Sequence, residues 1–211
     1  MRIILVSIVF FFAVSPVFAL TNTYADYFRL LGMAQSNVLI QALESEDLDM
    51  VYSAIHRIGE LGCTNAKKNI WAWLAQANPA ANAGKVQQET SLKEILRASV
   101  WAISRIGDDT DAQELVTYAK DIKKDDHETI REIIHALGAI RPSAAGLSFL
   151  NRLTREISDE RDAEELLLAI SNQNFQSSAN YLIVMSKNVS FSEGFREKLE
   201  KAATDLALKG N

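Results

Sequence analysis

Residues 47–74 read DLDMVYSAIHRIGELGCTNAKKNIWAWL and contain two apolar stripes at helical spacing. The first stripe has apolar residues three and four positions apart, on one face of a helix: Leu48, Val51, Ala54, Ile55 and Ile58. The second stripe is formed by Ala66, Ile70, Trp73, Leu74 and Ala77. Gly59 and Gly62 are expected to end the first helix, because glycine tolerates the left-handed backbone of a helix C-terminus. Two such short helices cannot bury their apolar faces alone and need similar pairs beside them.

Similar segments recur at the ends of later apolar stripes. Residues 54–59 read AIHRIG, residues 102–107 read AISRIG, residues 133–138 read IIHALG, and residues 168–171 are a weaker copy, LAIS, that lacks the glycine. Gly107 and Gly138 are 31 residues apart, whereas Gly59 and Gly107 are 48 apart, and the polar segment Asn78–Thr90 accounts for the excess. A repeat of about thirty residues that contains two helices is typical of an α-solenoid.

Both ends of the chain carry further helical patterns. Apolar positions over Ala25–Leu43 predict one helix, or two divided at Gly32, in the place of an N-terminal cap. Capping boxes at Ser91–Glu94 and Thr110–Gln113 predict helix starts, and the box at 190–193 opens a last helix. The sequence therefore predicts an all-α protein. Residues 20–211 are expected to form one domain, an α-solenoid of about four stacked antiparallel helix pairs with capping helices at both ends.

These repeats resemble the HEAT-repeat family, in particular its short bacterial type, whose first helix ends in A-x-x-x-I/L-G and whose second helix packs behind it. The resemblance covers residues 47–153 well and the rest loosely. It departs from the eukaryotic pattern, because no proline occurs in Leu48–Gly59, Leu92–Gly107 or His127–Gly138. In this family the second helices line the concave face, which implies candidate partner-binding residues on them: Lys67, Lys68, Trp71, Gln113, Glu114, Thr117 and Arg152.

Two features allow more than one interpretation. Trp71 falls on the flank of its helix beside Lys67 and Lys68. It is either an exposed interface anchor or a residue packed against the polar segment or a neighbouring repeat. The segment Asn78–Thr90 has no apolar period and is either a surface insertion or a binding loop.

The first nineteen residues have the pattern of a secretory signal peptide. Arg2 precedes an apolar run from Ile3 to Val14, and small residues precede a cleavage point after Ala19. The run is too short to span a bilayer, which needs roughly 20 apolar residues. Because Cys63 is the only cysteine, no lipid anchor is expected. We expect an exported protein, in the periplasm or otherwise secreted, with no membrane span after cleavage.

The remaining chain is acidic. Without Arg2, the 22 basic residues fall to 21 against 27 acidic ones, so the formal net charge is −6. Binding to nucleic acid requires clustered lysine and arginine, so we expect no nucleic acid partner. An anionic membrane surface is disfavoured for the same reason. A single cysteine excludes an intramolecular disulfide.

The residue types of a catalytic or metal site do not converge in the sequence. His56 and His135 share a repeat position, and Arg131 lies between His127 and His135, where it would repel a metal ion. The acidic run 108–111 lacks the later glycine and glutamate of an EF-hand loop. Cys63 has no histidine near it in sequence, and no hydrolase, zinc-protease or phosphate-loop motif occurs. We therefore predict no catalytic, cofactor-binding or metal-binding residues.

The resulting functional hypothesis is a non-enzymatic scaffold or adaptor that binds a protein or peptide of the cell envelope. It combines the repeats, the signal peptide pattern and the lack of catalytic motifs. The alternative is a lyase-type enzyme or an enzyme accessory, because some related short repeats occur in lyases that attach pigments to proteins. No residue of this chain matches such an activity.

Overall fold

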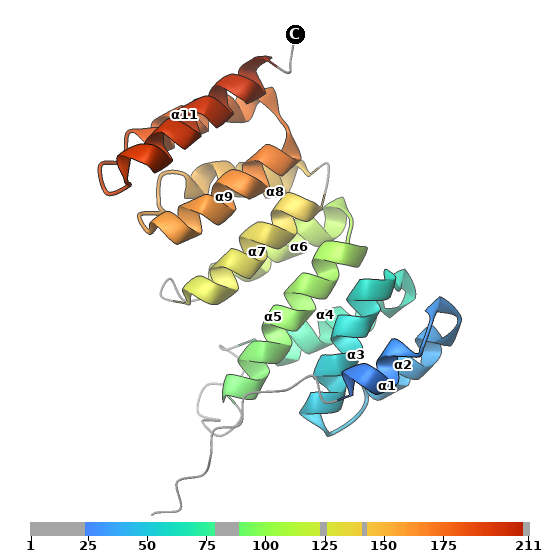
Figure 1. Cartoon of the computed structure of the whole chain (residues 1–211). Helices are drawn as coiled ribbons and strands as arrows, with labels where there is room; N and C mark the ends of the chain where they lie inside the picture. Colours follow the sequence, from blue (N-terminus) through green and yellow to red (C-terminus); the bar gives the residue numbers. More distant parts are fainter. Residues whose placement is uncertain (1–23, 79–88, 123–125, 141–142, 209–211) are drawn as a thin grey trace, which may run out of the picture.

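The computed structural model describes residues 24–78, 89–122, 126–140 and 143–208. In these ranges the chain forms α-helices and short 3₁₀ turns, with no β-strand, so the predicted all-α class is confirmed (Figure 1). The proposed signal peptide and most of the segment Asn78–Thr90 lie outside the described residues. No helix in these ranges combines the length and apolar character that crossing a bilayer requires.

The helices follow the chain order of the predicted ones, with boundaries shifted by a few residues. The bounds are α1 Ala25–Arg29, α2 Ser36–Ala42, α3 Leu48–Leu61, α4 Lys67–Gln76, α5 Glu89–Ile106, α6 Asp109–Tyr118, α7 His127–Ala139, α8 Ala144–Leu153, α9 Glu160–Gln173, α10 Ala179–Ser186 and α11 Glu193–Leu208. The 3₁₀ turns are Met33–Gln35, Thr64–Ala66, Ala119–Asp121 and Gln176–Ser178.

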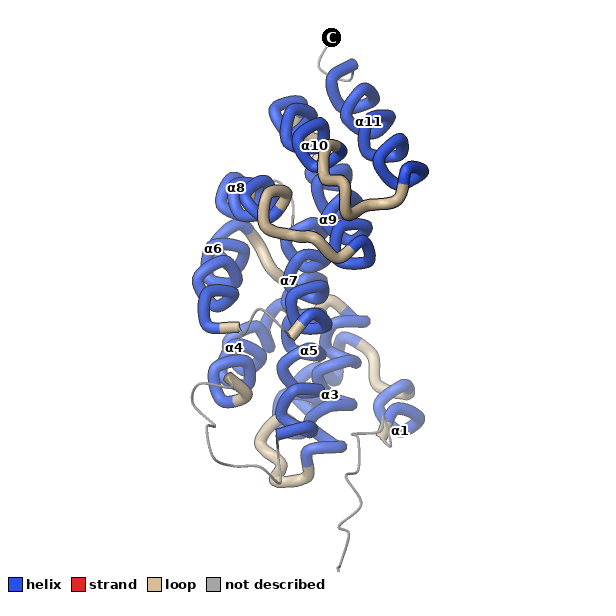
Figure 2. Tube along the Cα trace, turned by 90° about the vertical axis from the view of Figure 1, so that its left-hand side faces the viewer, coloured by secondary structure: helices blue, strands red, loops and turns tan. Residues whose placement is uncertain are grey.

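The helices are arranged in two layers. Helices α3, α5, α7 and α9 lie side by side in chain order and form the first layer (Figure 1). Helices α4, α6 and α8 form a second layer behind them, as the rotated view shows (Figure 2). Helices α1 and α2 pack on α3 at one end, and α11 packs on α10 at the other.

The core lies between the two layers. The stripe residues Val51, Ala54, Ile55 and Ile58 of α3 are fully buried, as are Ile70 and Leu74 of α4. Equivalent positions continue the core through later helices: Ile95, Leu96, Val100, Ile103, Ile134, Leu137, Leu166 and Ile170. Burying one such side chain contributes roughly 1.5–3 kcal/mol. The buried cluster is continuous from Phe28 to Leu206.

Two of the repeated glycines lie inside a helix rather than at its end, whereas Gly107 directly follows the end of α5. Gly59 lies inside α3, and a Cβ atom on it would overlap the ring of Trp101 on α5. Gly138 lies inside α7, where a Cβ atom would come within 2.5 Å of the Cα of Ala169 on α9. These two glycines therefore allow first-layer helices to approach closely. The helix stop of α3 is Gly62 alone, whose φ of 68° is left-handed.

Several helix starts also differ from the capping boxes read in sequence. Helix α5 begins at Glu89, so the box Ser91–Glu94 lies within its first turns. Helix α6 is capped by Asp108 and Asp111, which form a reciprocal box, rather than by Thr110. At α11 the hydroxyl of Ser192, not Ser190, accepts from the backbone N–H of Phe195. An aspartate side chain accepts such bonds readily, which explains why Asp108 rather than Thr110 caps α6.

Candidate functional site

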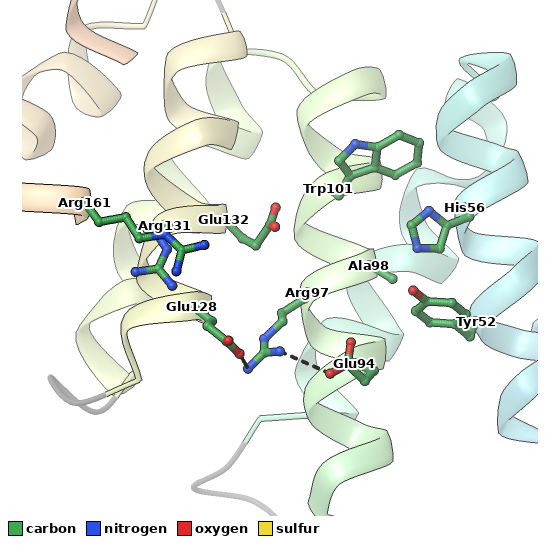
Figure 3. A pocket seen from close by; sticks show the side chains of 10 residues that line it. All are labelled: Tyr52, His56, Glu94, Arg97, Ala98, Trp101, Glu128, Arg131, Glu132 and Arg161. Atoms are coloured by element: carbon green, nitrogen blue, oxygen red, sulfur yellow. Dashed lines mark hydrogen bonds and ion pairs between the residues drawn. The ribbon is translucent and has the colours of Figure 1, made fainter. Parts of the chain in front are cut away.

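A groove of about 360 Å³ crosses the first layer and is called here the first-layer groove (Figure 3). Its lining comes from four successive first-layer helices: Tyr52 and His56 of α3, Glu94, Arg97, Ala98 and Trp101 of α5, Glu128, Arg131 and Glu132 of α7, and Arg161 of α9. The paired positions within one helix are three or four residues apart, so their side chains share a face. This face is the one that the apolar stripes leave outside the core.

One end of the groove is an aromatic wall formed by Tyr52, His56 and Trp101. The ring centres of Tyr52 and His56 are 4.6 Å apart, in an edge-to-face arrangement. The His56 and Trp101 centres are 4.9 Å apart. Burial lowers the pKa of His56, so the imidazole is neutral at neutral pH. The wall is therefore flat, polarisable and uncharged.

Two of the three arginines in the groove are held by carboxylates of the same chain. Arg97 donates from Nη1 to Glu94 Oε1 at 3.1 Å, and its Nη2 pairs with Glu128 of α7. Arg131 donates from Nη1 to Asp162 Oδ1 at 2.7 Å, which joins α7 to α9. These ion pairs link neighbouring first-layer helices and neutralise the positive charge of both arginines.

Glu132 and Arg161 are different, because neither makes a hydrogen bond or ion pair within the described part of the chain. Glu132 is half-buried and points from α7 toward α5 (Figure 3). Burial raises its pKa, and Glu165 adds to this effect, although His135, Arg97 and Arg131 oppose it. Arg161 is exposed at the α9 side of the groove. The groove therefore offers a ligand one carboxylate and one guanidinium group that have no partner among the described residues.

The groove lining consists of aromatic and charged side chains. The lining residues include no serine, threonine or cysteine, and His56 makes ring contacts rather than a hydrogen bond to a nucleophile. Among the described residues, no three His, Cys, Asp or Glu side chains are grouped as metal ligands would be. Cys63 is fully buried, and burial raises the pKa of its thiol.

Trp71 and Lys67, two of the sequence candidates, meet in a polar cluster of the second layer. Trp71 is half-buried, and its Nε1–H donates to Asp111 Oδ1 at 2.8 Å. Lys67 Nζ donates to Asp111 Oδ2 at 2.9 Å and to Asp108 Oδ2 at 2.7 Å. Of the two interpretations of Trp71, the structure shows packing against the neighbouring pair. A role in partner binding stays a prediction for both residues.

The other sequence candidates are exposed on the second layer. Lys68 lies on α4, and Gln113, Glu114 and Thr117 lie on α6. Arg152 of α8 stands 5.0 Å from the ring centre of Phe149 and 3.6 Å from Glu156. It lines a second cavity of about 540 Å³, whose apolar wall includes Ile130, Ile133 and Leu153. None of these five sequence candidates lines the first-layer groove.

Sequence reasoning missed the residues of the groove. It assigned partner binding to the second helices, on the resemblance to HEAT repeats. A usable signal was present in Trp101, a large aromatic residue that lies off the apolar stripe of its helix. Tyr52 and His56 are a further aromatic pair, four positions apart on the corresponding helix.

Comparisons with known proteins returned no match to this chain from family models, from curated proteins or from solved structures. The assignment of function therefore rests on the geometry of the groove.

Proposed function

We propose that the helix pairs form a HEAT-like α-solenoid and that the protein is an exported, non-enzymatic scaffold that binds a protein or peptide of the cell envelope. The binding surface is the first-layer groove. The observation that carries the proposal is the contrast inside this groove: most of its charges are paired within the chain, whereas Glu132 and Arg161 have no hydrogen-bond or ion-pair partner among the described residues. Two unpaired charges of opposite sign beside an aromatic wall are suited to polar and apolar groups of a ligand.

The first layer is long enough for a polypeptide segment to lie across the groove. The lining comes from α3, α5, α7 and α9. Packed helices lie roughly 8–10 Å apart, so four of them span roughly 25–30 Å. An extended chain advances about 3.3 Å per residue, so about eight or nine residues would cross this layer. The groove itself, at about 360 Å³, would accommodate side chains of such a segment rather than its whole length.

The proposed compartment rests on the signal peptide pattern of residues 1–19. An acidic exported chain without clustered lysine and arginine is suited to a protein or peptide partner rather than to nucleic acid.

Site-specific photo-crosslinking tests the function. Residues 20–211 would be prepared with a photoreactive amino acid at position 161, in the groove, or at position 68, on the second layer, and mixed with envelope extract. We expect adducts from position 161 and none from position 68. Mass spectrometry of the adduct would identify the bound segment, and a synthetic copy should bind the unlabelled protein saturably. Adducts from position 68 alone, or from neither position, would contradict the groove as the binding surface.

A further inference from the structure

We propose that Glu132 and the aromatic wall of Tyr52, His56 and Trp101 bind an arginine side chain of the partner. This inference rests on the proposed function and specifies what one end of the groove recognises. Glu132 points from α7 toward α5, whereas Trp101 stands on α5 with its ring turned toward His56 of α3 (Figure 3). All three line the same groove, so an arginine side chain that lies across α5 would meet the aromatic surface on the α3 side of this helix and the carboxylate on its α7 side.

The charge pattern of the groove favours a cation at this position. Glu94 and Glu128 already pair with Arg97, so their charge is compensated within the chain. Glu132 has no such partner among the described residues, although it is half-buried. A half-buried carboxylate without a hydrogen-bond donor is costly in its charged form, and an incoming cation removes that cost. The raised pKa of Glu132 reflects the same unfavourable burial.

The aromatic wall favours arginine over lysine. A guanidinium group is planar and stacks on an aromatic face while its edge donates two hydrogen bonds to a carboxylate. Tryptophan is the strongest partner for a cation among aromatic side chains. His56 contributes a neutral ring, because burial lowers its pKa, and it therefore does not repel the incoming charge.

The opposite ligand, a carboxylate, is disfavoured at this end of the groove. The arginines whose charges act on Glu132 are Arg97 and Arg131, and both are already paired with acids of the chain. An acidic side chain would have to displace one of these pairs and would approach Glu132 with a like charge. Arg161, which has no ion-pair partner in the described part of the chain, lies on α9 at the other side of the groove.

Peptide titrations followed by nuclear magnetic resonance test this inference. The probes are N-acetylated, C-amidated alanine-based hexapeptides with arginine, citrulline, lysine or leucine at the centre. The readout is the indole N–H signal of Trp101, assigned by its loss in Trp101→Phe. The chain contains three tryptophans, and the indoles of Trp71 and Trp73 are already hydrogen-bonded within the protein. We expect a saturable shift with the arginine peptide and binding about tenfold weaker or worse with citrulline, its neutral isostere.

Glu132→Gln is the decisive variant, because it preserves shape and removes only the charge. It should weaken binding of the arginine peptide about tenfold and abolish the preference over citrulline. Glu164→Gln is the matched control, because Glu164 is an exposed acid on α9 that pairs with Lys198 outside the groove. Removing this charge should leave the binding of both peptides unchanged. Equal binding of the arginine and citrulline peptides, an unaffected Glu132→Gln variant, or no saturable shift would overturn the inference.

The two proposals fail separately. If a segment crosslinked at position 161 binds the protein but its affinity is unchanged by Glu132→Gln, the arginine inference is wrong and the scaffold function stands. If the arginine peptide binds through Glu132 but no adduct forms at position 161, the recognition chemistry stands and the envelope scaffold function is wrong.

Discussion

Asp111 and Asp162 are buried carboxylates at the third positions of α6 and α9. Asp111 accepts from Trp71 and Lys67 of α4, and Asp162 accepts from Arg131 of α7. Sequence reasoning placed Asp111 in the acidic run 108–111. It could not supply the long-range partners, because they lie 40 and 44 positions away in the chain. These two aspartates in the first turn of their helices therefore also link those helices to their neighbours.

Trp71→Phe tests how much the Asp111 contact contributes. The change retains most of the apolar surface and removes the indole donor, and a hydrogen bond to a charged group is worth about 1.5–3 kcal/mol. Lys67 and the Asp108 N–H bond only Oδ2 of Asp111, so Oδ1 loses its donor, and we expect a loss of about 1.5–3 kcal/mol in the free energy of unfolding. Lys68→Ala, an exposed neighbour, should change it by less than ~0.5 kcal/mol. Urea denaturation measures both, and equal small effects would show that Trp71 is not structurally engaged.

The pH dependence of stability tests the contact between His127 and Asp162. A hydrogen bond of 2.6 Å to the Asp162 carboxylate raises the pKa of His127 above its usual value of about 6.5. The folded state thus binds the proton more tightly than the unfolded state. The resulting stability is fully present below about pH 6.5 and is lost as pH rises through the folded-state pKa. The free energy of unfolding of wild type minus that of His127→Gln should therefore decrease over this range.

Asp162→Asn provides the control for this prediction. In that background the acceptor is neutral, so adding His127→Gln should no longer change the pH profile. A difference between wild type and His127→Gln that instead grows with rising pH would contradict the assigned pKa direction. His56 has the opposite sign, because burial lowers its pKa, and its stabilisation is lost as pH falls below about 6.5. Because His127→Gln changes only His127, its difference from wild type isolates the pH dependence that comes from His127.

At the scale of the helix, the apolar stripes predicted which face of each helix is buried, and the repeated glycines showed how many pairs to expect. The role of those glycines was not predictable from the local pattern. A glycine at the end of an apolar stripe is compatible with a helix stop or with close packing. Which of these two roles a glycine has depends on the residue that faces it from the neighbouring helix, as Ala169 faces Gly138. That neighbour is fixed only when the layers assemble.

Gly138→Ala and Gly194→Ala form a matched pair that tests close packing. A methyl group at Gly138 would lie 2.5 Å from the Cα of Ala169, and backbone cannot move aside as a side chain can. We expect a loss of about 1–3 kcal/mol in unfolding free energy from overpacking. Gly194 is also helical and has nothing within 4 Å of such a methyl group. There the change should be neutral or stabilise by up to about 1 kcal/mol. Equal effects in thermal denaturation would remove the packing explanation.

At the scale of the whole molecule, the buried faces were predictable and the groove was not. Periodicity within one helix identifies its core side, as Ile55 and Ile134 show. The groove, in contrast, exists because side chains from α3, α5, α7 and α9 come together, and their relative rotation is set by contacts such as Trp101 on Gly59. The resemblance to HEAT repeats directed attention to the second helices, whereas the groove lies on the first.

Hydrogen exchange tests the proposed solenoid at the same scale. In a linear array each helix pair contacts only its neighbours, so a local loss of stability stays local. Leu199 of α11 and Ile55 of α3 are both fully buried, at opposite ends of the core. Truncating either to alanine should cost about 2–5 kcal/mol locally. We expect Leu199→Ala to reduce amide protection in α10 and α11 while α3 and α5 keep theirs, and Ile55→Ala to give the reverse pattern. If both variants lower protection evenly along the chain, the helices unfold as one cooperative unit, and the linear-array description is wrong.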